Sequence, residues 1–211
     1  LLVEGRHIDL VSEAGAESTI LDGSKDDMPT LSLRGERAAG TRIAGFTVTG
    51  GLGVGHPSGK DKHGIIHYGG GLSVLHGATA TVVSSVLWRN GYRPPDRGTS
   101  FGGGAHVGAG SALLMRSCII TGNGAWASGG AIMNTGGDLM LERCTVTANA
   151  SGDFYGRQGG LGLAEVASVT LRHSIVSGNQ GRQLDIFAGG ADLQASADVA
   201  YSLIARDDPS L

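Results

Sequence analysis

The sequence predicts an all-β protein built as one parallel solenoid of about seven coils. Three observations predict it: a motif that recurs along the chain, a high glycine content, and short apolar runs rich in β-branched residues. Glycine supplies 38 of the 211 residues, about 18% against the roughly 7% usual in proteins. Each glycine inside a helix costs about 1 kcal/mol, so this composition excludes a repeat built from helices.

The recurring motif is clearest in residues 118–132, CIITGNGAWASGGAI. It consists of a small residue, an apolar pair, an asparagine, a loop and a glycine pair. The small residues that we align with one another are Ser18, Gly45, Ser85, Cys118, Cys144, Ser174 and Ser202. The asparagines are Asn90, Asn123, Asn149 and Asn179, and the glycine pairs lie at residues 70–71, 103–104, 129–130 and 159–160. Both sets recur at intervals of 33, 26 and 30 residues, which indicates stacked structural repeats.

Short β-branched runs such as residues 118–121, 145–147 and 168–171 are typical of strands. None is long enough to be stable alone. Stacked in parallel at about 4.8 Å per coil, seven of them would form a rod on the order of 34 Å long.

The spacing within the repeat indicates which part of each coil varies. From the second glycine to the next small residue there are 14 residues in every repeat, as from Gly71 to Ser85. From the asparagine to the first glycine the gap varies, from 6 residues after Asn123 to 20 after Gly50, which we place at the asparagine position. We therefore expect every insertion on one edge of the solenoid. Asparagine side chains stacked at that corner would form a structural ladder, since asparagine tolerates a left-handed turn.

These motifs, together with SVLWRN, CTVTAN and SIVSGN, resemble the right-handed parallel β-helix of the pectin-lyase-like superfamily. They are most similar to the GGAI and FxxN repeats of polymorphic outer-membrane proteins and related bacterial surface proteins. The resemblance implies a single-stranded right-handed parallel β-helix, an extracellular or cell-surface location, and an adhesin-like or carbohydrate-binding role. The superfamily also includes polysaccharide lyases, so the motifs alone do not choose between binding and catalysis.

Composition limits the remaining possibilities. We expect one domain over residues 1–211, and because Leu1–Val3 already read as a strand, we expect it to be a fragment of a longer precursor with flanking domains. The formal net charge of −3 provides no broad basic field, which argues against a nucleic-acid partner. No apolar run reaches the roughly 18 residues of a transmembrane helix, and no signal peptide is recognisable.

The insertion loops contain most of the candidate ligand-binding residues. Residues 51–69 contain His63, His67 and Tyr68, which could hold zinc, form a polar ligand surface, or lie in an ordinary exposed loop. The following loops contribute the remaining candidates: Tyr92, Arg93, Asp96, Arg97, Trp126, Asp153, Tyr155 and Arg157. Seven of the ten aromatic residues lie in the variable segments. They either pack as small satellite cores or line a groove in which rings stack on sugars.

One histidine stands on a predicted strand. Alternation after the glycine pairs predicts that Ser73, His106, Ile132 and Gly162 point out of the coil, while Ala131 and Met133 point inward. His106 is next to the first two loops, so we expect it either to contact a ligand or to face solvent without a role.

The two cysteines occupy equivalent positions on consecutive coils. Cys118 and Cys144 would lie about one strand spacing apart, within disulfide range. Parallel in-register strands aim both side chains in the same direction, which favours two reduced, stacked core thiols over a disulfide.

Two functions follow from these residues. The first is a secreted or surface β-helix module that binds a polysaccharide or a surface protein without catalysis. The alternative is a calcium-dependent polysaccharide lyase that acts on acidic glycans by β-elimination. In lyases of this fold, carboxylates hold calcium against the sugar and a basic residue removes a proton, so Asp96 and Asp153 would bind calcium and Arg93, Arg97 or Arg157 would be catalytic.

Overall fold

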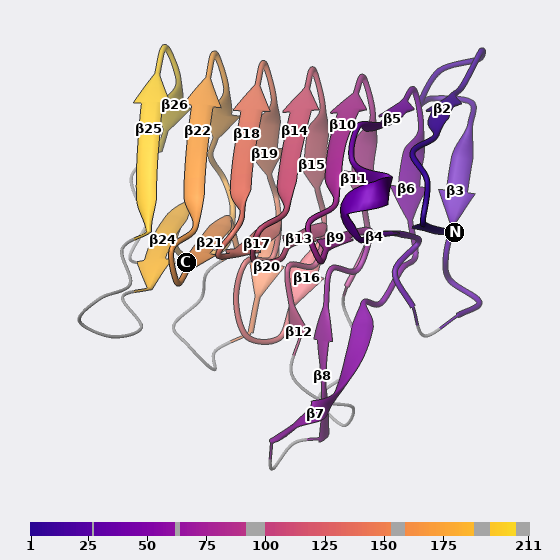
Figure 1. Cartoon of the computed structure of the whole chain (residues 1–211). Helices are drawn as coiled ribbons and strands as arrows, with labels where there is room; N and C mark the ends of the chain where they lie inside the picture. The colour runs from indigo at the N-terminus through magenta and orange to yellow at the C-terminus, as the bar shows by residue number, and fades with distance from the viewer. Residues whose placement is uncertain (27, 62–63, 92–99, 153–158, 188–194, 206–211) are drawn as a thin grey trace.

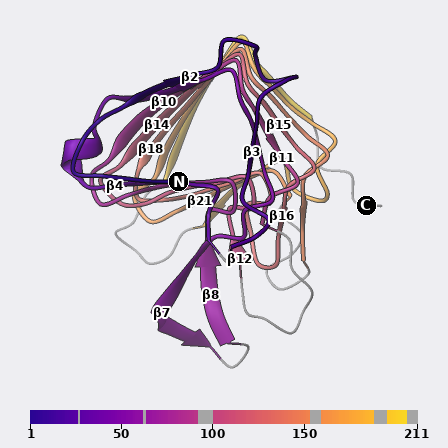
Figure 2. The same cartoon turned by 90° about the vertical axis from the view of Figure 1, so that its right-hand side faces the viewer.

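The chain forms a three-sided solenoid in the computed structural model, with three parallel sheets of seven strands each. Seen along its axis in Figure 2, each coil passes once through every side. The structure describes all residues except 27, 62–63, 92–99, 153–158, 188–194 and 206–211, and describes residues 54–61, 64–66 and 187 by their backbone alone. The all-β parallel solenoid of about seven coils that the sequence predicts is confirmed.

Each sheet takes one strand from every coil (Figure 1). Sheet A contains β1 (Leu2–Glu4), β4 (Leu31–Arg34), β9 (Leu72–Leu75), β13 (Ala105–Val107), β17 (Ile132–Thr135), β21 (Leu161–Ala164) and β24 (Leu184–Phe187). Sheet B contains β2 (Asp9–Val11), β5 (Thr41–Ala44), β10 (Thr79–Val83), β14 (Ala112–Arg116), β18 (Asp138–Glu142), β22 (Ser168–Arg172) and β25 (Ser196–Ala200). Sheet C contains β3 (Ile20–Asp22), β6 (Thr47–Thr49), β11 (Val86–Trp88), β15 (Ile119–Thr121), β19 (Thr145–Thr147), β23 (Ile175–Val176) and β26 (Leu203–Ile204).

Five further strands lie outside these sheets. They are β7 (Val54–Asp61), β8 (Gly64–Tyr68), β12 (Ser100–Phe101), β16 (Gly124–Ala125) and β20 (Ala150–Ser151). A short 3-10 helix, η1 (Glu36–Ala38), turns the second coil from sheet A to sheet B. Within the described part of the chain, no helix has the length and hydrophobicity that crossing a bilayer requires.

The core is a stack of aliphatic side chains in which each coil contacts the next. In sheet A, Leu72, Ala105, Ile132 and Leu161 pair along one inward column, and each is at most 1% exposed. Sheets B and C contribute similar columns, such as Val82, Met115 and Leu141. Burial of these columns, rather than the short strands themselves, holds the coils together.

The predicted asparagine ladder is confirmed. The side-chain amides of Asn90, Asn123 and Asn149 each donate to Oδ1 of the asparagine on the next coil, at 2.8–3.0 Å. The same oxygens accept the backbone N–H of the preceding asparagine at 3.0–3.1 Å. At the last coil Gln183 takes the place of an asparagine, because its Oε1 accepts both the backbone N–H and the amide of Asn179. Gln183 was not anticipated, since it breaks the spacing of the ladder.

The alignment of the first two coils was wrong by one residue. Ser18 and Gly45 were placed beside Ser85, but pairing of Ile20 with Thr47 and of Thr47 with Val86 puts Thr19 and Phe46 in that column. Likewise Gly51, not Gly50, takes the asparagine position, and its N–H donates to Asn90 Oδ1 at 3.2 Å. Phe46, only 5% exposed, fills a position that is small in the later coils, and this large residue concealed the register.

The fifth coil required a second correction. Gly103 and Gly104 receive hydrogen bonds and pairing from Gly130 and Ala131, not from the pair at 129–130. The interval to Cys144 is therefore one residue shorter than in the other coils. Asn134 closes the tighter corner, since its amide donates to the carbonyl of Gly137 at 2.9 Å and its Oδ1 accepts the Gly137 N–H at 2.9 Å. The half-coil that we expected to be constant in length is constant elsewhere but not here.

The two cysteines are reduced and buried, as predicted. Each thiol donates to a carbonyl of the preceding coil: Cys118 to Val82 at 3.5 Å and Cys144 to Met115 at 3.4 Å. The hydrogen bond to Cys144, followed by burial, raises the pKa of the Cys118 thiol. Both therefore serve as small core residues in the column of Ser85 and Ser174.

Candidate functional site

The insertions of the described chain all lie at the corner where sheet C passes into sheet A, as the sequence predicts. Strands β7, β8, β12, β16 and β20 each follow a strand of sheet C and precede the next strand of sheet A. Figure 2 shows β7, β8, β12 and β16 together on this side of the coil. We call this edge the C–A corner.

The insertions are stacked on one another as well as attached to the solenoid. β7 and β8 form an antiparallel hairpin, and β8 pairs with β12, placing Tyr68 beside Phe101. An isolated bridge continues the column from Phe101 to Ser128, and β16 pairs with β20 on the following coils. The corner is thus a second, shorter set of strands that follows the coil spacing.

These strands cover the outward face of sheet A. The outward column consists of Ser32, Ser73, His106, Met133, Gly162 and Asp185. None of its side chains is more than 7% exposed. The chain folds back over this column at Gly69 (φ 67°), where an added Cβ would lie 2.9 Å from the His106 Cβ. Only glycine permits so close an approach together with a left-handed backbone.

Ser73, His106 and Gly162 point outward as predicted, but the prediction for the fifth coil was wrong. Met133 is the outward residue there, while Ile132 and Asn134 face the core. The cause is the one-residue shift of the glycine pair, because a single-residue slip exchanges the two faces of a strand.

His106 is buried, and this overturns the expectation that it is available at the surface. It is 5% exposed and lies beside the Tyr68 ring, with 4.8 Å between ring centroids. Tyr68 in turn stacks on Phe101 at 5.4 Å. These rings therefore form a satellite core over the histidine, which was the simpler of the two interpretations of the loop aromatics.

The polar contacts of His106 are incomplete within the described residues. Its Nε2 lies 2.8 Å from Thr135 Oγ1, whereas Nδ1 has no hydrogen-bond partner. The neighbouring Ser73 hydroxyl is also buried and unpartnered among those residues. Desolvation by burial lowers the pKa of His106 to about 4, so the imidazole is neutral at pH 7.

The other predicted residues separate into two groups. His67 and Trp126 lie at the corner: His67 Nδ1 is 3.4 Å from the Gly53 carbonyl, and Trp126 is half-buried beside Gly152. The remaining candidates, His63, Tyr92, Arg93, Asp96, Arg97, Asp153, Tyr155 and Arg157, lie outside the described residues. Searched over the described residues alone, the chain contains no cluster of three histidine, cysteine or acidic side chains that could hold a metal ion.

The stacked three-sheet geometry agrees with comparison against known families. Residues 60–199 match the family model described as a right handed beta helix region. The chain belongs to the right-handed β-helix family. No curated protein and no solved structure matches this β-helix.

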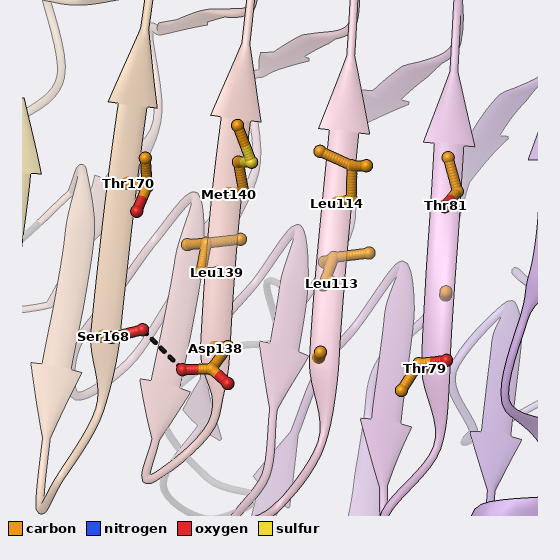
Figure 3. Close-up of a pocket in the computed structure, with 11 residues that line it drawn as sticks. Thr79, Thr81, Leu113, Leu114, Asp138, Leu139, Met140, Ser168 and Thr170 are labelled. Atoms are coloured by element: carbon orange, nitrogen blue, oxygen red, sulfur yellow. Dashed lines mark hydrogen bonds between the residues drawn. The ribbon is translucent and has the colours of Figure 1, made fainter. Parts of the chain in front are cut away.

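A shallow groove of about 420 Å³ lies on the outer face of sheet B in this β-helix. Figure 3 shows Thr79, Thr81, Leu114, Met140 and Thr170 along it. Ser168 Oγ donates to Asp138 Oδ1 at 2.6 Å at one side. A single exposed carboxylate among hydroxyl and aliphatic groups does not provide an acid–base pair, so the groove offers contact area rather than chemistry.

Proposed function

We propose that this β-helix is a non-catalytic binding module, secreted or displayed at a cell surface, whose C–A corner contacts a polysaccharide or a surface protein. The observation that carries the proposal is that the described insertions all emerge at this one corner and stack upon each other. A rigid solenoid with variable segments along one edge suits recognition, since loops on a rigid scaffold can vary without disturbing the core.

The described part of sheet A supports binding over catalysis. A general acid or base must come within hydrogen-bond reach of its substrate. His106 lies beneath Tyr68, and Asp185 is 7% exposed and paired with Arg182. Neither group is placed to exchange a proton with a polymer lying on the surface.

The calcium-dependent lyase is the competing hypothesis. Its candidate calcium ligands, Asp96 and Asp153, and its candidate bases, Arg93, Arg97 and Arg157, are all loop residues outside the described part of the chain. The assay below therefore has to decide between the two functions.

The test measures binding and cleavage on the same polymers. Pectate, alginate, glycosaminoglycans and a glycan array are incubated with the protein, with and without calcium. We expect binding without the ultraviolet absorbance of an unsaturated product. Formation of that product would establish the lyase instead.

A pair of variants locates the binding surface. Replacing residues 54–66 with a short Gly–Ser linker removes most of the β7–β8 hairpin, and we expect it to weaken binding at least tenfold. The matched control, Glu36→Ala with Arg37→Ala, alters exposed residues at the A–B corner and should leave binding unchanged. Equal binding by all three proteins would move the site away from the C–A corner.

A further inference from the structure

We propose that the outer face of sheet C is a separate binding surface for a neutral, linear polysaccharide, with Trp88 and Tyr201 as stacking platforms. This face lies on a different side of the coil from the buried column at the C–A corner. It does not depend on the corner being a binding site.

The outward positions of sheet C form two columns that run the length of the solenoid. The first contains Ile20, Thr47, Val86, Ile119, Thr145, Ile175 and Leu203. The second contains Asp22, Thr49, Trp88, Thr121, Thr147 and, by backbone hydrogen bonding, Ser177 and Ala205. In these columns Asp22, on the first coil, is the sole ionisable side chain.

Sheet B shows that the absence of charge is particular to sheet C. The outer face of sheet B contains the ion pairs Arg116–Glu142 and Arg172–Asp198, each joining adjacent coils. On sheet C the corresponding surface consists of aliphatic and hydroxyl groups, and Ile119 and Ile175 are 46% and 44% exposed. Such a face favours an uncharged partner, since a charged one would lose hydration without gaining a counterion.

The two clearly exposed aromatic side chains of the described chain both border this face. Trp88 is 39% and Tyr201 84% exposed, whereas Phe46 is buried and Tyr68 and Phe101 are half-buried beneath the corner. Trp88 and Tyr201 were missed at the sequence level because attention went to aromatics in the insertion loops. Their residue type carried the signal: an exposed ring has no packing role.

Both rings are held in place by their neighbours. The Arg89 guanidinium lies over the Trp88 ring, 4.5 Å from its centroid. On the next coil, a Cβ added to Gly122 would be 3.3 Å from Trp88 Cδ1, so the indole extends over that glycine. Tyr201 stacks on His173 with centroids 5.2 Å apart and planes at 7°. Rings fixed in advance lose little entropy when a ligand stacks on them.

The arrangement between the rings suits a sugar chain. Trp88 is on the third coil and Tyr201 on the seventh, so four strand spacings separate them, about 19 Å along the rod. Thr121, Thr147 and Ser177 follow Trp88 along its column. Sugar rings present apolar faces to aromatic side chains and hydroxyl edges to hydroxyl groups, which this surface offers alternately.

The dimensions argue against a second copy of the chain as the partner. Two outward columns, about 7 Å wide and about 34 Å long, make a stripe of roughly 240 Å². A stable protein interface buries about 800 Å² on each partner. A narrow, extended, uncharged stripe matches a single polymer chain better than it matches a protein surface.

The test uses cellohexaose, xylohexaose, mannohexaose and chitohexaose as probes, titrated into the full chain by isothermal calorimetry. We expect at least one to bind, and Trp88→Ala and Tyr201→Ala each to raise its Kd at least tenfold. Trp88→Phe should retain most of the affinity. Thr81→Val, on the outer face of sheet B, is the matched control and should have no effect.

Three outcomes would overturn the proposal. They are binding of none of the four oligosaccharides, a Kd unchanged by Trp88→Ala, or self-association of the chain that Trp88→Ala abolishes. The protein with residues 54–66 replaced separates this surface from the corner: it should bind the neutral probe normally even if its binding at the C–A corner is lost.

Discussion

At the residue scale, the asparagine ladder makes the sharpest demand on single side chains. Asn123 Oδ1 accepts both the N–H and the amide of Asn90, while its own amide donates to the Leu87 carbonyl at 2.9 Å. Asn123→Ala would leave the buried N–H of Asn90 without a partner. A buried unsatisfied donor costs about 1–3 kcal/mol. We expect a loss of that size or greater in the free energy of unfolding, measured by urea denaturation.

The control for this variant is Thr121→Ala, two residues away and half-buried on sheet C. It should cost less than about 1 kcal/mol, as is usual for surface substitutions. If Asn123→Ala cost no more than the control, water would be replacing the ladder contacts and their structural role would be minor.

His106 leads to a second residue-scale prediction, on pH dependence. Its pKa is lowered from 6.5 to about 4 in the folded chain. Between these values the unfolded chain binds a proton that the folded chain does not, so stability falls as pH falls through this window. The full difference corresponds to about 3 kcal/mol.

The measurement compares the wild type with His106→Leu, from pH 7.5 to pH 4.5. We expect the free energy of unfolding of the wild type to decrease more steeply with acidification. The other histidines titrate in both proteins and cancel in the difference. Parallel pH profiles would show that acid opens the site by another route before His106 is protonated.

At the scale of elements, the β7–β8 hairpin is predicted to be an addition to the solenoid rather than part of its frame. Sheet A pairs directly from β4 to β9 without it. Replacing residues 54–66 with a Gly–Ser linker should therefore leave a cooperatively folded solenoid with the same far-ultraviolet circular dichroism. Because the cover over His106 is reduced, its pKa should rise from about 4 toward 6.5.

An NMR titration of the His106 ring protons measures that change, with Glu36→Ala at the opposite corner as the control. A pKa that remained near 4 would mean that Tyr68, which stays in the variant, is sufficient to exclude water. Loss of the folded signal would mean that the hairpin is part of the frame.

The same elements show what could be read from the sequence. Repeats with an asparagine and glycines define the sheets and the insertion corner, because those residues meet backbone requirements that recur at every coil. The register of the fifth coil could not be obtained, since Asn134 shortens a corner that carries no repeat signature. Burial of His106 was also inaccessible, because it depends on how Tyr68 folds back over Gly69.

At the scale of the whole molecule, a solenoid is stabilised mainly by contacts between neighbouring coils, so its ends have fewer stabilising contacts than its middle. At one end Ile8, Leu10 and Leu21 are only partly buried, and at the other so are Leu184 and Ile204. Equivalent side chains of the inner coils, such as Leu113 and Leu141, are at most 1% exposed. Local opening should therefore begin at both ends.

Hydrogen exchange measures this gradient directly. We expect the amides of β10, β14, β18 and β22 to exchange at least tenfold more slowly than those of β2 and β25, although all belong to sheet B. Leu113→Ala in the central coil removes buried volume worth about 2–5 kcal/mol. It should accelerate exchange in β10 and β18 before it affects β2 or β25. Uniform protection, with Leu113→Ala accelerating exchange everywhere equally, would show that the seven coils open as one unit and that coupling between neighbours exceeds the deficit at the ends.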